Sequence, residues 1–167
     1  RVAGLLGMRP DDERIPDSFE IARKMGLSYS FGIANLTSAH PNSVVLEVKG
    51  KSGRTLEVQA CSLGGGRIMI NRLDGLDVNC SCEIPTLIVH NLDQPGHVAE
   101  VTSMLAHKSV NIANMSLYRD KRGGSAVMVV EMDQPLPKES LEWLEHLEGI
   151  VKVTYINVTE GDEDDVL

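Results

Sequence analysis

The stretch TLIVHNLDQPGHVAEVTSML, Thr86 to Leu105, decides the fold of the second half of this chain. The apolar run at its start, residues 86–90, predicts a short strand. After Pro95 and Gly96, apolar residues recur at helical spacing, and this pattern predicts a helix over about 96–108. The stretch therefore predicts a strand, a polar loop and an amphipathic helix.

The residues that follow extend this pattern into a complete structural unit. The further predicted elements are strands over about 110–119, 125–131 and 151–157 and a helix over about 138–148. Their order is βαββαβ, which is ferredoxin-like. Such a unit has two helices on one face of its sheet, a free opposite face, and edge strands that invite pairing with a second copy.

The first half of the chain predicts a different arrangement. The predicted elements are one helix over 17–26 and three strands over 43–48, 55–61 and 67–71. We therefore predict an α+β protein with three parts. They are a partial helix-plus-antiparallel-sheet domain over 1–82, a ferredoxin-like domain over 83–158 and a solvated acidic tail over 159–167.

Composition narrows the possible functions. The net charge is −8 and the pI is about 5.1, which argues against nucleic acid or an anionic membrane as the main partner. No apolar run approaches the roughly 20 residues of a membrane span, and no signal peptide is visible. An odd number of cysteines, three, suggests a reducing, cytoplasmic setting.

The polar loop before the predicted helix offers groups that suit a small ligand. If Pro95 lies in the first helical turn, the free backbone N–H groups there can bind a carboxylate, and Gly96 allows close approach. Asp93 offers a partner for an ammonium group, and Asn91 can both donate and accept. The alternative interpretation is that Asp93 or Gln94 merely caps the helix while Asn91 completes a turn.

Two other features have both a functional and a structural interpretation. Gly64, Gly65 and Gly66 can form a backbone anion nest beside Arg67, or simply a tight hairpin turn. The three cysteines, Cys61, Cys80 and Cys82, are too few and wrongly spaced for a cysteine-ligated cluster, and we interpret them as buried small residues. The sequence predicts no catalytic residues and no metal ligands.

The segment VHNLDQPGHVAEVTSMLAHKSVNIANMSLYRD resembles the ACT domain, a regulatory βαββαβ module of amino-acid metabolism. The resemblance implies that Asn91, Asp93 and Asn111 face an amino acid held across a domain–domain interface. We expect Asn111 to begin a strand adjacent to the one that ends at Asn91 and Asp93. Serine-binding members of the family usually have His and Asn at the first two of these positions. Here His90 falls one place too early, and in a strand a shift of one residue reverses the face.

The segments DERIPDSFEIARKMG, HPNSVVLEV and SLGGGRIMINRLDG extend the resemblance to the first half of the chain. They resemble the end of the allosteric-substrate-binding-type domain that precedes an ACT domain in the beta subunit of bacterial iron–sulfur L-serine dehydratase. The chain begins without Met and lacks that family's Gly-Pro-Ser-Ser-Ser-His-Thr segment. We therefore expect a fragment of a longer protein.

This resemblance implies a lyase that converts L-serine to pyruvate and ammonia. The expected partners are a catalytic alpha subunit holding a [4Fe-4S] cluster, a second copy bound through the ACT domain, and a small-molecule effector; K⁺ is an expected activator. Two alternatives remain open. One is a stand-alone ACT amino-acid sensor, and the other is the regulatory end of a phosphoglycerate dehydrogenase.

Overall fold

A computed structural model describes residues 2–36 and 39–157 of the chain. The predicted acidic tail, 159–167, lies outside these described residues. The chain forms two compact units, one within residues 1–35 and the other within residues 36–160. None of the described helices is both long and apolar enough to cross a lipid bilayer.

The first unit is helical. It contains α1 (Val2–Leu5), a 3₁₀ turn (Ile15–Asp17) and α2 (Ser18–Lys24). Helix α2 corresponds to the predicted helical segment 17–26: Asp17 is its N-cap residue, and Gly26, the last residue of that segment, ends it in a left-handed conformation with φ of 75°. The Leu27 N–H then donates to the Ala22 carbonyl at 2.9 Å, the backbone bond that ends many helices at a glycine.

The second unit begins with an antiparallel four-stranded sheet in the order β1-β2-β3-β4. Its strands are β1 (Ser43–Lys49), β2 (Thr55–Gly64), β3 (Arg67–Leu73) and β4 (Leu76–Cys80). Strand β4 is not among the predicted strands. It is joined to β3 by Asp74 and Gly75, which both have positive φ (46° and 83°), as a two-residue hairpin turn requires.

The second sheet confirms the predicted βαββαβ order. Its elements are β5 (Thr86–Leu92), α3 (His97–His107), β6 (Ile112–Arg119), β7 (Ser125–Met132), α4 (Lys138–Glu145) and β8 (Ile150–Ile156). The strand order is β6-β7-β5-β8, with antiparallel neighbours throughout. Strands β5 and β6 therefore run parallel to each other with β7 between them.

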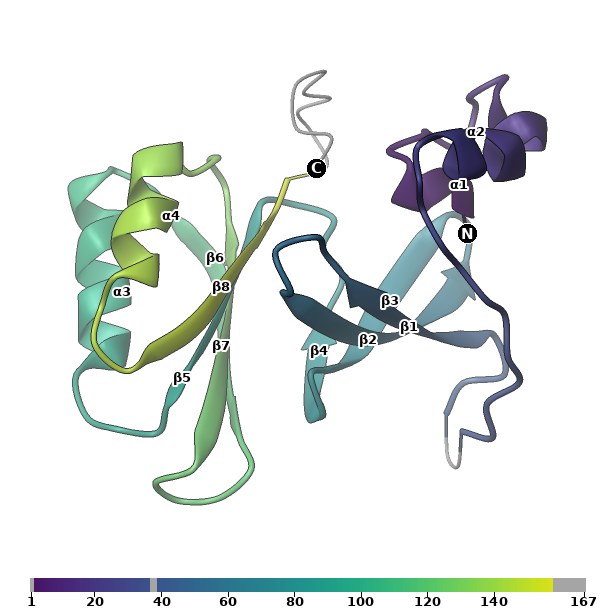
Figure 1. Cartoon of the computed structure of the whole chain (residues 1–167). Helices are drawn as coiled ribbons and strands as arrows, with labels where there is room; N and C mark the ends of the chain where they lie inside the picture. Colours follow the sequence, from purple (N-terminus) through teal and green to yellow (C-terminus); the bar gives the residue numbers. More distant parts are fainter. Residues whose placement is uncertain (1, 37–38, 158–167) are drawn as a thin grey trace. The chain divides into compact units, whose positions relative to one another are not determined.

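Both faces of this second sheet are buried. Figure 1 shows α3 and α4 on one side of it and the β1–β4 sheet on the other. The helix side buries Leu87 and Val89 of β5, whereas Ile88 packs with Leu73 and Val78 of the first sheet. The prediction of a free sheet face is therefore wrong, because the apolar residues of β5 and β7 point alternately to both sides. The boundary predicted between residues 82 and 83 lies between the two sheets, inside this unit, and the domain limits stay a prediction.

Candidate ligand-binding site

The loop between β5 and α3 lies at the carboxyl end of β5. Helix α3 begins at His97, and Gly96 precedes it with φ of 111°, a conformation that other residues rarely adopt. Pro95 therefore lies before the first helical turn and not in it as predicted, so a carboxylate would have to use the N–H groups of α3 itself. The N-cap residue of α3 is Gly96, and no side-chain hydrogen bond caps the helix there. The capping role considered for Asp93 or Gln94 is therefore not found.

Asp93 connects this loop to the hairpin between β6 and β7. Its Oδ2 accepts hydrogen bonds from Arg119 Nη1 at 3.1 Å and from the Gly123 N–H at 2.9 Å. The Gly123 N–H and the charge of Arg119 lower the pKa of Asp93. One carboxylate oxygen is thus engaged within the protein. The role predicted for Asp93, an ammonium partner, would have to use Oδ1 or displace Arg119.

Asn91 lies on the helix side of the sheet, on the same face as Leu87 and Val89. It is 6% exposed, and its Nδ2 donates to the Leu92 carbonyl at 2.6 Å. Its Oδ1 is buried and has no hydrogen-bond partner within the described residues. A buried amide oxygen without a donor is destabilising by about 1–3 kcal/mol, so this atom is a candidate acceptor for a ligand.

His90 lies on the opposite face, as the one-residue shift predicted. Its Nε2 is 3.6 Å from Oδ2 of Asp74, in the β3–β4 turn, and that Oδ2 also accepts from Lys152 Nζ at 2.6 Å. Burial lowers the pKa of His90, although the Asp74 carboxylate opposes this effect. His90 therefore belongs to the contact between the two sheets and not to the β5–α3 loop.

His97, the first residue of α3, is a site residue that the sequence reasoning missed. It is 7% exposed, its Nδ1 lies 3.2 Å from Oε2 of Glu100, and its buried Nε2 has no partner among the described residues. A Cβ added at Gly149 would come within 2.6 Å of the imidazole ring. The available signal was a histidine directly after Pro-Gly at the start of a predicted helix.

Asn91 and His97 border the same short segment before β8. Asn91 is paired in register with Ile150. A Cβ on the preceding residue, Gly149, would meet the His97 ring, and the Gly149 carbonyl accepts from the Leu92 N–H at 2.9 Å. The end of β5, the start of α3 and the start of β8 thus meet at one place. Two buried polar atoms without partners, Asn91 Oδ1 and His97 Nε2, are found there.

Asn111 is not part of this group within one chain. It directly precedes β6, and its Nδ2 donates to Asp133 Oδ2 at 2.5 Å while its N–H donates to Gln134 Oε1 at 2.7 Å. Because β6 and β5 run parallel, the start of β6 lies at the opposite end of the sheet from Asn91. The expectation that Asn111 begins a strand adjacent to β5 is wrong, since β7 lies between the two.

The Gly64–Gly66 segment forms a hairpin turn. Gly64 pairs with Arg67, and the two residues between them, Gly65 and Gly66, have φ of 63° and 79°. Such a turn needs positive φ at both central positions, which glycine adopts without strain. Anion binding by Gly64, Gly65, Gly66 and Arg67 stays a prediction.

The cysteines are buried free thiols, and Sγ of Cys80 lies 3.0 Å from Sγ of Cys82. Within residues 2–36 and 39–157, no group of three or more His, Cys, Asp or Glu side chains is placed to hold a metal ion. The donor set of this part of the chain therefore does not fit an iron–sulfur cluster, which takes four protein ligands.

The chain is similar to one protein-domain family and to several known proteins. The ACT domain model matches residues 85–148. The chain is 33% identical over 155 residues to the probable L-serine dehydratase beta chain of Bacillus subtilis, covering 93% of this chain and 70% of that protein. It is 32% identical over 158 residues to the L-serine dehydratase beta chain of Peptoniphilus asaccharolyticus, covering 94% and 71%. The D-3-phosphoglycerate dehydrogenase of Methanocaldococcus jannaschii is 31% identical over 90 residues, covering 54% of this chain and 17% of that protein.

Proposed function

Because the chain belongs to the L-serine dehydratase beta-chain family, we propose that it is the regulatory and structural beta subunit of an enzyme that converts L-serine to pyruvate and ammonia. The extent of the similarity supports this assignment. Both beta chains match over more than nine-tenths of this chain, and so include both sheets. The chain covers 70% and 71% of the length of the two beta chains but only 17% of the length of the dehydrogenase of Methanocaldococcus jannaschii.

The proposal assigns catalysis to an alpha subunit. Both relatives are named beta chains, and this name implies an alpha subunit as their partner. The [4Fe-4S] cluster, bound by that subunit, would supply a Lewis acid for departure of the serine hydroxyl, and K⁺ would act as an activator. No step of the reaction is assigned to residues of this chain. The proposed setting is the reducing cytoplasm, which suits three free thiols.

The proposed role of the ACT domain is to bind a small ligand and a second copy of the chain. The observation that carries the ligand site is the buried Asn91 Oδ1, which lacks a donor, beside the equally unpartnered His97 Nε2. An ammonium or hydroxyl group can supply the donor for Asn91, and the backbone N–H groups at the start of α3 suit a carboxylate. L-serine carries all three groups.

A second copy explains the position of Asn111. Strand β6 is an edge strand, so its outer backbone groups are available to another chain. If two β6 strands pair in antiparallel fashion, the start of one lies beside the end of the other. The partner's Asn111 then approaches the end of the sheet that carries Asn91 and Asp93. In this arrangement the site is complete only in the dimer.

Calorimetry with L-serine and with KCl tests the ligand site. We expect Asn91→Ala to weaken L-serine binding by about 1–3 kcal/mol, because one hydrogen bond to a charged group is lost. Asn111→Ala should weaken it as well, whereas Asn114→Ala, which removes an exposed amide on the same strand, should not. Asp93→Asn should abolish binding of K⁺ and only weaken binding of L-serine. If neither ligand binds the dimeric wild type at millimolar concentration, the loop is a connector.

Copurification tests the subunit assignment independently of the ligand. The full-length chain expressed with its neighbouring genes should copurify with a cysteine-rich alpha chain in a brown, iron-containing complex. Purification without such a chain would instead favour a stand-alone ACT sensor. Purification as part of a dinucleotide-binding polypeptide would favour a phosphoglycerate dehydrogenase.

A further inference from the structure

Cys80 and Cys82 form a thiol pair at the connection between the two sheets. Cys80 is the last residue of β4, and Cys82 is the second residue of the link that leads to β5. Their sulfurs are 3.0 Å apart, about 1 Å more than the length of a disulfide bond. Both side chains are buried, at 2% and 6% exposure. The two thiols are therefore in direct contact.

The backbone explains how residues only two apart bring their sulfurs together. Cys82 has φ of 54°, a left-handed conformation that is uncommon outside glycine. This turn places the Cys82 side chain in the same apolar cluster as Cys80, together with Ile88 and Val129 of the ACT sheet. In an extended link the two side chains would lie on the same face, but their Cα atoms would be about 6.6 Å apart, which leaves the sulfurs farther from each other. Residues held in such conformations cluster at functional positions.

The surroundings differentiate the two thiols. The hydrogen bond with the Cys82 thiol lowers the pKa of Cys80 despite its burial, and the Cys82 backbone N–H and the Thr86 hydroxyl add to this effect. The same contact raises the pKa of Cys82, and burial adds to this effect. These opposite directions favour Cys80 as the thiol that ionises. In thiol chemistry the thiolate is the nucleophile, so Cys80 is the attacking group and Cys82 the resolving group.

We propose that Cys80 and Cys82 are a redox modification site that forms an intramolecular disulfide with hydrogen peroxide and thereby rigidifies the link over residues 81–85. Glu131 and Pro85 already attach this link to β7. The Ser81 hydroxyl donates to Glu131 Oε1 at 3.3 Å, and the Met132 N–H donates to the Pro85 carbonyl at 2.8 Å. A disulfide between Cys80 and Cys82 would hold the start of the link, and the hydrogen bond between Pro85 and Met132 already holds its end.

The reaction balances in two steps. The Cys80 thiolate attacks one peroxide oxygen, the O–O bond breaks, and the departing hydroxide takes a proton to become water. The product is a sulfenic acid on Cys80. The Cys82 sulfur then attacks the Cys80 sulfur, the S–O bond breaks, and the hydroxide leaves as water with the Cys82 proton. Two thiols are oxidised to one disulfide while one peroxide is reduced to two waters. Hydrogen peroxide is a small oxidant and therefore suits a buried thiol pair better than a larger, disulfide-containing oxidant does.

Mass spectrometry of the wild type tests the proposal directly. After brief treatment with peroxide, the protein is denatured, alkylated and weighed intact, with and without prior reduction by dithiothreitol. We expect a mass lower by two hydrogens, one alkylated thiol without reduction, and three after it. Peptide mapping should locate the bond between Cys80 and Cys82. Three alkylated thiols without reduction, a product that dithiothreitol does not reverse, or a bond between chains would each overturn the proposal.

A matched variant and a structural measurement complete the test. Cys61→Ser removes another buried cysteine and should still form the bond, whereas Cys80→Ser and Cys82→Ser should not. Backbone hydrogen exchange over residues 81–85 should be slower in the oxidised wild type than in the reduced protein. Unchanged exchange in a protein shown to carry the bond would refute the effect on the link.

Discussion

Gly149→Ala should be one of the most destabilising single-methyl additions in the ACT domain. Gly149 has φ of 81°, where a residue with a Cβ is disfavoured by roughly 1–2 kcal/mol. The added Cβ would also come within 2.6 Å of Cε1 and Nε2 of His97. Displacing a buried ring costs about 1–3 kcal/mol as overpacking. The two effects together predict a loss of roughly 2–5 kcal/mol in the free energy of unfolding.

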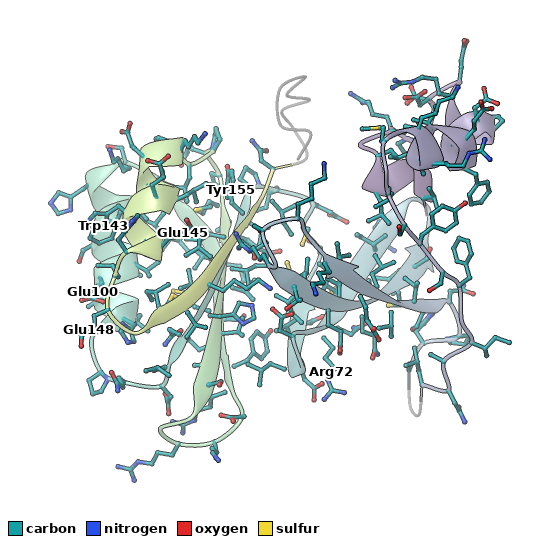
Figure 2. All side chains as sticks on the ribbon, in the orientation of Figure 1. Arg72, Glu100, Trp143, Glu145, Glu148 and Tyr155 are labelled. Atoms are coloured by element: carbon teal, nitrogen blue, oxygen red, sulfur yellow. The ribbon has the colours of Figure 1, made fainter. Side chains whose placement is uncertain are left out.

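Urea unfolding measures this loss. The single tryptophan, Trp143, lies on α4 of the same unit (Figure 2) and provides a fluorescence signal alongside circular dichroism. Gly65→Ala is the matched control, because Gly65 has φ of 63° but no heavy atom within 4 Å of the added Cβ. This control should show the backbone cost alone, about 1–2 kcal/mol.

A double-mutant cycle then isolates the contact with His97. Combining Gly149→Ala with His97→Ala should recover about 1–3 kcal/mol relative to the sum of the single changes, because the overpacked ring is gone. Equal losses in Gly149→Ala and Gly65→Ala, or strict additivity in the cycle, would refute the reasoning about this site.

The remaining predictions concern pH, assembly and catalysis. Burial lowers the pKa of His90, so below about 6.5 the unfolded chain binds a proton that the folded protein resists. The free energy of unfolding should therefore fall between pH 7 and pH 5, less steeply in His90→Gln than in the control His146→Gln; parallel pH curves would contradict this. Light scattering should give twice 18.2 kDa at tens of micromolar, and a monomer there would count against pairing through the ACT sheet. The purified chain alone, after treatment with iron and sulfide, should release no pyruvate from L-serine above the blank, and measurable turnover would disprove the division of labour with an alpha subunit.

Periodicity was sufficient to predict the ACT fold because its elements are long and strongly patterned. The strands over 86–90 and 125–131 and the helix over 96–108 each correspond to an element of the structure. Strand β4 was missed although its hairpin turn, Asp-Gly, is a strong local signal. The alternation in Leu76-Asp-Val-Asn-Cys80 extends over only five residues, which is too short to give a strong periodic signal.

The candidate site was only partly predictable, for two physical reasons. The face on which Asn91 lies follows from strand alternation, so its burial toward the helices could be inferred from Leu87 and Val89. The pairing of Asp93 with Arg119 depends on where a distant hairpin folds, which no local pattern reveals. Strand order likewise is not local, and this is why Asn111 was wrongly expected beside β5.

The burial of the second sheet face has a consequence for how this chain can be divided. Ile88, Val127 and Val129 are at most 2% exposed because the first sheet covers them. An ACT fragment cut out at residue 83 would present these three side chains to water on one flat surface. Exposing each of these side chains costs roughly 1.5–3 kcal/mol of free energy. The excised sheet is therefore expected to aggregate or to bind another apolar surface. We therefore expect the segment that folds by itself to be longer than residues 83–158, the predicted limits of the ACT domain.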